Sequence, residues 1–151
     1  MERYAAALGA DCAFFITAEP AYATGIGEIL SPADSPKGNL QGYHLVVVKP
    51  PVAVSTREAY AQITPRHPAI CCKDIVRQPI EGWRSLLTND FEAPAFKSHP
   101  ILADIKQRLY DLGAAYAQMS GSGSAIYGLF KEKPQVPSDT FSGCEVFEME
   151  L

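Results

Sequence analysis

The arrangement of apolar and polar residues predicts several β-strands, most of them after residue 40. Residues 43–49 form an almost continuous apolar run that ends at Pro50-Pro51, which is typical of a short strand buried on both faces. Residues 116–118 and 125–130 are predicted to pair as a hairpin. In residues 144–151, glutamates alternate with apolar side chains, which predicts a last strand with one face in water.

The clearest helical pattern covers residues 98–112. Pro100 suits the first turn of a helix, and Gly113 suits the position just after its end. Apolar residues recur at helical spacing, so one stripe of the helix is expected to face the core. The stripe consists of Ile101, Ile105, Leu109 and Leu112.

Weaker patterns predict shorter helices between the first strand and this long helix. Ser55 followed by Glu58 fits a capping box, which predicts a helix as far as about residue 63. Residues 75–87 are interrupted by Pro79 and Gly82, so we expect two short turns there. Asn89 is the expected N-cap of a further helix with acidic residues in its first turn.

The N-terminal part of the chain has a different organisation. Residues 21–29 predict a strand broken by a bend at Gly25-Ile26-Gly27, and residues 31–38 have the composition of a loop and an internal boundary. Residues 5–8 are helix-like, with Gly9 suited to the helix end. No cap signal precedes that helix, so we expect the chain to open within an element of something longer.

From about residue 40 the predicted order is a strand, several helices, a hairpin and a strand. This order is typical of an α+β fold, an antiparallel sheet covered on one face by helices. We therefore divide the chain into residues 1–38 and residues 39–151.

Composition narrows the function classes. The 151 residues are 47% hydrophobic with a net charge of −4, and the Lys and Arg residues form no cluster that would favour duplex nucleic acid. There is no apolar run near 18 residues and no signal peptide, so we expect neither a membrane span nor secretion. Four cysteines without zinc-ligand spacing predict no metal site and a reduced, cytoplasmic location.

A run of small residues provides the best candidate for binding chemistry: Ser120, Gly121, Ser122, Gly123 and Ser124. Glycines let the backbone approach a ligand closely, and successive N–H groups together with serine hydroxyls can hold an anion. The sequence lacks the lysine of a P-loop, the third glycine of a dinucleotide motif and the glycine spacing of a nucleophile elbow. From this run of residues alone, the favoured alternative is a simple small-residue hairpin or bend that leads into a buried strand.

Asp11 is the candidate catalytic group in the N-terminal part. It precedes a strongly apolar run that contains Phe14 and Phe15. One interpretation is an N-cap for a short helix, which the residue type favours. The other is a carboxylate beside an apolar wall that takes up a proton.

Four segments in order resemble the C-terminal half of a GHMP-superfamily small-molecule kinase. They are Leu8-Gly9-Ala10-Asp11 followed by Phe14-Phe15, then the segment from Ala23 to Leu30 with Gly25-Ile26-Gly27-Glu28, then Asn89-Asp90-Phe91-Glu92, and finally residues 119–128. The resemblance covers nearly the whole chain and implies a ferredoxin-like C-terminal domain in residues 39–151. Residues 1–38 would be the end of the preceding kinase domain.

The resemblance implies ATP-dependent phosphorylation of an alcohol, with ATP and Mg²⁺ as cofactors. Its second and third segments point to a branch whose substrate is the cytidyl diphosphate of methylerythritol, a precursor of isoprenoids. By this resemblance Asp11 is the general base, and the run Ser120–Ser124 is a wall of the phosphate and substrate site. Thr56 and Tyr60 fall on the substrate side, where the ring of Tyr60 would stack on cytosine or, alternatively, only pack its own helix.

The chain also departs from the family pattern. Cys12-Ala13 stands where the family commonly has Val-Pro. The family's glycine-rich ATP loop and its catalytic lysine are absent, so we expect this chain to be inactive alone and to self-associate through apolar residues near Phe15. Two rival hypotheses remain: a related kinase acting on homoserine or a mevalonate derivative, and a non-catalytic, anion-binding ferredoxin-like module.

Overall fold

The computed structural model describes residues 9–33 and 40–151. The chain divides into two compact units, residues 1–40 and residues 41–151, and each is described by itself. The helix expected at residues 5–8 lies outside the described residues. Gly9, expected at its end, has an extended backbone with φ of 177° rather than the left-handed conformation of a C-cap.

The first unit begins with a short helical segment. A 3₁₀ turn, η1 (Ala10–Ala13), runs into α2 (Phe14–Thr17), which ends at Ala18 in the left-handed region. Asp11 lies inside η1, and no side chain caps either helix, so the N-cap interpretation of Asp11 is wrong. Phe15 is 73% exposed, which agrees with the expected apolar surface near it.

A hairpin follows, made of β1 (Ala21–Thr24) and β2 (Ile29–Pro32). The predicted bend at Gly25-Ile26-Gly27 is present, and both glycines have positive φ. The carboxylate of Glu28 accepts the amide of Ile26 at 2.7 Å and so closes the turn. Residues 31 and 32, which were expected in a loop, instead pair with β1 as part of β2, and residues 34–38 of that prediction lie outside the described residues.

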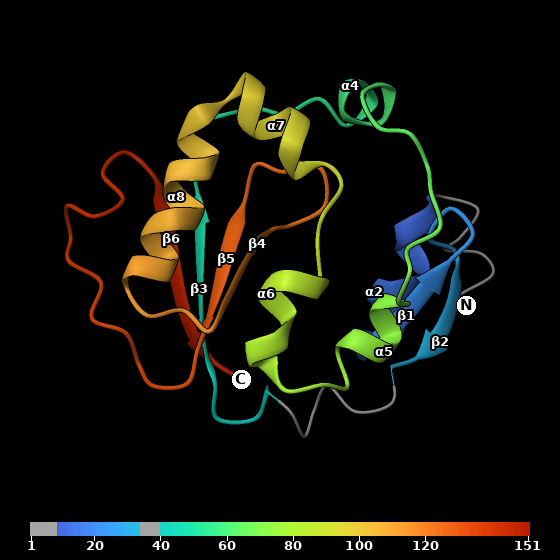
Figure 1. Ribbon diagram of the computed structural model, residues 1–151, viewed down its shortest axis with the longest axis horizontal. Helices are drawn as coiled ribbons and strands as arrows, with labels where there is room; N and C mark the ends of the chain where they lie inside the picture. Colours follow the sequence, from blue (N-terminus) through green and yellow to red (C-terminus); the bar gives the residue numbers. More distant parts are fainter. Residues whose placement is uncertain (1–8, 34–39) are drawn as a thin grey trace. The chain divides into compact units, whose positions relative to one another are not determined.

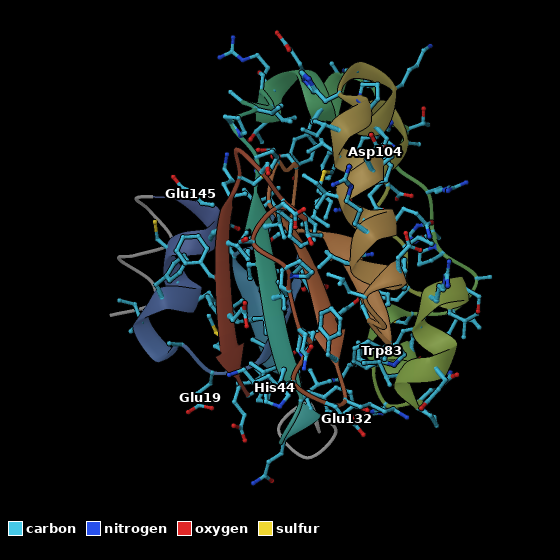
Figure 2. The ribbon with its side chains drawn as sticks, turned by 90° about the vertical axis from the view of Figure 1, so that its left-hand side faces the viewer. Glu19, His44, Trp83, Asp104, Glu132 and Glu145 are labelled. Atoms are coloured by element: carbon cyan, nitrogen blue, oxygen red, sulfur yellow. The ribbon has the colours of Figure 1, made fainter. Side chains whose placement is uncertain are left out.

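The second unit is built on a four-stranded antiparallel sheet. Its strands are β3 (His44–Lys49), β4 (Tyr116–Met119), β5 (Ile126–Phe130) and β6 (Glu145–Glu150), in the order β4-β5-β3-β6. The α+β prediction is therefore confirmed, including the hairpin of β4 and β5. Figure 2 shows the sheet from its side, with His44 and Glu145 near opposite ends of the β3–β6 pair.

The longest helix of this unit and the short helix α6 (Trp83–Leu86) contact β4, whereas α4 (Thr56–Ala61) lies beyond the ends of the strands (Figure 1). The longest, α8 (Pro100–Asp111), packs on β4 and β5 and completes the core with Val46 and Val48 of β3. Its buried positions are Leu102, Ile105 and Leu109. The expected stripe was wrong at one position: Ile101 is exposed, and Leu102, one residue further, turns to the core instead.

The remaining helices are short. They are α4 (Thr56–Ala61), α5 (Cys72–Ile75), η2 (Ile80–Gly82), α6 (Trp83–Leu86) and α7 (Glu92–Ser98). Ser55 caps α4 as predicted, accepting the amide of Glu58. The interruption expected within residues 75–87 is also present, because Pro79 precedes η2.

The last strand, β6, differs from the prediction of one wet face. All six of its residues are exposed, including Val146, Phe147 and Met149. The physical reason is its position: β6 is an edge strand that pairs only with β3, whereas α8 packs on β4 and β5 at the other side of the sheet. Likewise, β3 is fully buried at Val46 and Val48 on the α8 side but only half-buried at Leu45 and Val47 on the other.

Candidate functional site

The loop Ser120–Ser124 joins β4 to β5, and its backbone forms a compact turn. The amide of Ser120 donates to the carbonyl of Ala125 at 2.9 Å, and the amide of Gly123 donates to the carbonyl of Ser120 at 3.0 Å. Gly121 and Gly123 both have positive φ, as the small-residue pattern requires. Two of the loop's N–H groups therefore hold its own shape.

Other N–H groups of this loop remain available. Within residues 9–33 and 40–151, the amides of Gly121 and Ser122 donate no hydrogen bond. Gly121 is exposed and Ser122 is half-buried. Adjacent amides beside a glycine of positive φ are the arrangement that binds anionic oxygens.

Ser124 belongs to the framework of the loop rather than to its open side. The residue is buried, and its hydroxyl donates to the carbonyl of Val52. The ammonium group of Lys49 donates to this hydroxyl at 3.0 Å and also to the carbonyls of Pro50 and Val52. Three oxygens satisfy the three donors of Lys49, so this lysine fixes the loop to the segment after β3.

Sequence reasoning did not identify this role of Lys49, because a lysine at the end of a strand is ordinarily a solvated group. The sequence contains no local signal for this role, because the hydroxyl that Lys49 contacts belongs to Ser124, 75 positions further along the chain.

Helix α4 brings Thr56 and Tyr60 to the same region. The hydroxyl oxygens of Thr56 and Ser122 lie 2.9 Å apart and share a hydrogen bond. Tyr60 is 62% exposed, and its ring meets Phe91 edge to face. A largely exposed ring held by one aromatic neighbour still has a face on which a base can stack.

The segment Asn89–Glu92 contacts the loop from the other side. The side-chain amide of Asn89 donates to the carbonyls of Met119 and Gly121, both at 2.8 Å. The carboxylate of Glu92 accepts the amide of Met119 at 2.9 Å. The loop, α4 and this segment therefore form one connected constellation on the second unit.

Asp11 lies on the first unit and is exposed. Its carbonyl accepts the amide of Phe14 within the η1 turn, which leaves the carboxylate on the surface of that turn. The constellation described above consists of residues of the second unit, and Asp11 belongs to the first unit.

Two features are absent from the residues that the structure describes. Within the described ranges, no three His, Cys, Asp or Glu side chains gather closely enough to hold a metal ion. In the same ranges, none of the helices has the length and apolar character needed to cross a membrane.

Comparison with protein families gives a match over the second unit. Residues 73–140 match the family model described as GHMP kinases C terminal. A crystal structure of 4-(cytidine 5'-diphospho)-2C-methyl-D-erythritol kinase superposes with a TM-score of 0.68 at 33% identity, over 85% of this chain and 47% of that one. The resemblance predicted from the sequence is confirmed, and the second unit has the fold of the C-terminal domain of GHMP kinases.

Curated relatives agree with this fold. The 4-diphosphocytidyl-2-C-methyl-D-erythritol kinase of Bacteroides fragilis is 48% identical over the whole chain and 54% of its own length. The protein of the same name from Parabacteroides distasonis is 44% identical over the whole chain and 55% of its own length. The chain thus spans about half the length of these relatives.

Proposed function

We propose that this chain is the C-terminal part of an ATP-dependent kinase that phosphorylates the 2-hydroxyl of 4-diphosphocytidyl-2-C-methyl-D-erythritol, in the non-mevalonate route to isoprenoid precursors. In this proposal residues 1–38 end the N-terminal kinase domain and carry Asp11, and residues 39–151 form the C-terminal domain. The similarity to relatives of that name along the whole chain supports the substrate.

The observation that carries the proposal is the constellation around the loop. Gly121 and Ser122 offer adjacent amides for phosphate oxygens, and Ser120 is exposed beside them. Tyr60 offers an exposed ring for the cytosine base, on a helix linked to the loop through Thr56 and Ser122. A diphosphate and a base are the two ends of a cytidyl diphosphate group, and the constellation has a recognition element for each.

Catalysis in this proposal depends on positioning and on a proton acceptor. Phosphoryl transfer needs the hydroxyl nucleophile oriented and its proton taken up, while fixed donors neutralise charge on the phosphates. We assign the proton acceptor to the exposed carboxylate of Asp11. The substrate-binding residues are Thr56, Tyr60, Ser120, Gly121, Ser122 and Gly123, and Ser124 holds the loop in shape.

ATP would supply the transferred phosphoryl group. The described residues offer no group of carboxylates that fits Mg²⁺, so we assign no residue of this chain as its ligand. We expect the ion to be held by ATP oxygens and by groups outside this chain.

A fusion protein tests the proposal. The chain is joined to the N-terminal part of the Bacteroides fragilis kinase that it does not match, and ADP formation is measured with and without the cytidyl substrate. We expect substrate-dependent turnover by the fusion and none by residues 1–151 alone, because positioning of ATP accounts for most of the catalysis in this chemistry. A fusion that folds but has no activity would refute the proposal. Turnover by residues 1–151 alone would refute the assignment of ATP positioning to the part outside this chain.

We also propose that residues 1–151 self-associate when isolated. We expect the protein to work in the cytoplasm. Phe15 and Ile16 are exposed on the first unit, and such side chains favour association when they are contiguous. Sedimentation velocity of the chain and of its Phe15→Ser variant checks this, and an isolated chain that remains a monomer at high concentration contradicts it.

A further inference from the structure

The segment Asn89–Glu92, which precedes and opens α7, holds the candidate phosphate loop by an unusual set of contacts. Asn89 uses its whole side-chain amide. Its Nδ2 donates to the carbonyls of Met119 and Gly121, and its Oδ1 accepts the amide of Phe91 at 2.9 Å. The reverse orientation of the amide would set an oxygen against two carbonyls, so the network fixes the orientation.

Glu92 adds a charged contact next to the first. Its Oε1 accepts the amide of Met119 at 2.9 Å, and its Oε2 pairs with the ammonium group of Lys106 at 2.6 Å. The Glu92 side chain is only 13% exposed. Charge-assisted hydrogen bonds of this kind are shorter and stronger than neutral ones, so Glu92 is a rigid anchor.

These contacts occur where the sheet has no neighbouring strand to provide them. β4 is an edge strand, and its outward backbone groups at Ala117 and Met119 have side-chain partners instead. The Tyr110 hydroxyl bonds both the amide and the carbonyl of Ala117. Glu92 and Asn89 do the same for the amide and the carbonyl of Met119, the last residue before the loop.

Asn89 also contacts the loop itself, in addition to the edge of strand β4. Its second contact, to the carbonyl of Gly121, is inside the loop, between the two residues whose amides are available for anions. Fixing this carbonyl fixes the peptide plane whose N–H belongs to Ser122. Asn89 therefore sets the direction in which an amide of the candidate phosphate site points.

We propose that Asn89 and Glu92 are positioning residues for the phosphoryl transfer, acting through the loop Ser120–Ser124. This inference rests on the proposed function. Neither residue is expected to touch the substrate. Both keep the loop amides aligned with the phosphate oxygens, and a misalignment of this kind lowers the rate of the chemical step more than it weakens binding of the base.

The decisive variant is Asn89→Asp in the active fusion protein. Asp keeps the size and the oxygen that accepts the amide of Phe91, but it replaces the donor to Met119 and Gly121 with an acceptor. We expect kcat to fall about 10-fold or more while KM for the cytidyl substrate changes less than about 3-fold. Glu92→Gln, which keeps an acceptor for Met119 and loses the charge, should give a smaller fall in kcat.

Asp90→Asn is the matched control, because Asp90 lies in the same segment and, among residues 9–33 and 40–151, its carboxylate pairs only with the exposed Arg66. It should leave both constants unchanged. A second readout is hydrogen exchange of residues 1–151 at the amides of Ser120 and Gly123, which the loop itself protects. Exchange there should be faster in Asn89→Asp and unchanged in Asp90→Asn.

The outcomes separate the two hypotheses. Unchanged kcat in an active Asn89→Asp fusion overturns the positioning role. A rise in KM as large as the fall in kcat also overturns it, because it indicates that binding is lost. If the unmutated fusion is inactive, the proposed function fails and hydrogen exchange alone decides: faster exchange in Asn89→Asp supports control of the loop by Asn89, and unchanged exchange overturns it.

Discussion

The rings of Tyr60 and Phe91 meet edge to face, with centroids 4.9 Å apart and planes inclined at 76°. Phe91 belongs to the segment Asn89–Glu92 that holds the loop Ser120–Ser124. One segment therefore supports both the ring proposed to bind the base and the loop proposed to bind the phosphates. Because the two ring planes are nearly perpendicular, Phe91 can cover at most one face of the Tyr60 ring, which leaves the other face for a base.

Substitutions of Tyr60 test its role. In the fusion protein, Tyr60→Phe should preserve affinity for the cytidyl substrate, because the flat ring rather than the hydroxyl makes the contact. Tyr60→Ala should raise the dissociation constant by roughly 5- to 150-fold, the equivalent of about 1–3 kcal/mol of stacking. Isothermal titration measures both. Equal affinity of the alanine variant and the parent would assign Tyr60 to packing alone.

Gly121 and Gly123 are expected to differ in how much stability the protein loses when a side chain is added. A Cβ on Gly123, whose φ is +96°, would lie 2.8 Å from Sδ of the buried Met119, whereas a Cβ on Gly121 meets no atom within 4 Å. We expect Gly123→Ala to lower the free energy of unfolding by about 2–3 kcal/mol, from the left-handed backbone and the clash together. Gly121→Asn is the control, because Asn adopts positive φ readily, and should cost less than about 1 kcal/mol.

Urea unfolding followed by fluorescence measures this difference. Trp83 is the only tryptophan of the chain and is buried in the second unit beside Tyr116, so its emission reports on that unit. Equal stabilities of Gly123→Ala and Gly121→Asn would contradict the loop conformation described here.

Alkaline pH should destabilise the second unit. Burial, and to a smaller extent the negative charge of Glu92, raises the pKa of Tyr127 from 10.0 to about 12. Burial also raises the pKa of Tyr116. Between pH 10 and pH 12 the Tyr127 hydroxyl is deprotonated in the unfolded chain but still protonated in the folded chain. The free energy of unfolding therefore falls as pH rises from about 10 to about 12. Below pH 10 both states are protonated and the effect vanishes.

Replacing the titrating group provides the check. In Tyr127→Phe, the free energy of unfolding measured through Trp83 should decline less steeply over that pH interval. An identical decline in the parent and the variant would show that Tyr127 has the same pKa in both states.

The sequence was sufficient for much of this fold because local patterns and burial agree. The apolar run before Pro50, the Ser55 cap and the hairpin with its glycines all give their elements without tertiary information. Ile101 shows where local pattern is insufficient: the same stripe of a helix can be rotated by one residue, and only packing against β4 and β5 selects Leu102. The exposure of β6 likewise depends on which strands α8 covers.

The residues of the candidate site could be predicted from the sequence, but not which of them bind a ligand and which hold the loop in shape. The run Ser120–Ser124 was identified as a unit, yet Ser124 is a framework residue because Lys49, distant in sequence, donates to its hydroxyl. Contacts between distant segments have no local pattern. For the same reason, the hydrogen bond from Asn89 to the carbonyl of Gly121 could not be predicted, although the resemblance to a family identifies the segment that contains Asn89.

The role of Asp11 is tested by removing its charge and keeping its shape. Asp11 is exposed in the η1 turn and caps no helix, so Asp11→Asn should leave thermal unfolding of the fusion protein almost unchanged. If its carboxylate takes the proton of the substrate hydroxyl, kcat should fall by about 10²-fold or more, since an amide cannot accept that proton. KM should change little. Glu19→Gln, another exposed carboxylate of the same unit, is the control and should retain full turnover. Near-normal kcat in Asp11→Asn would assign the proton transfer to another group.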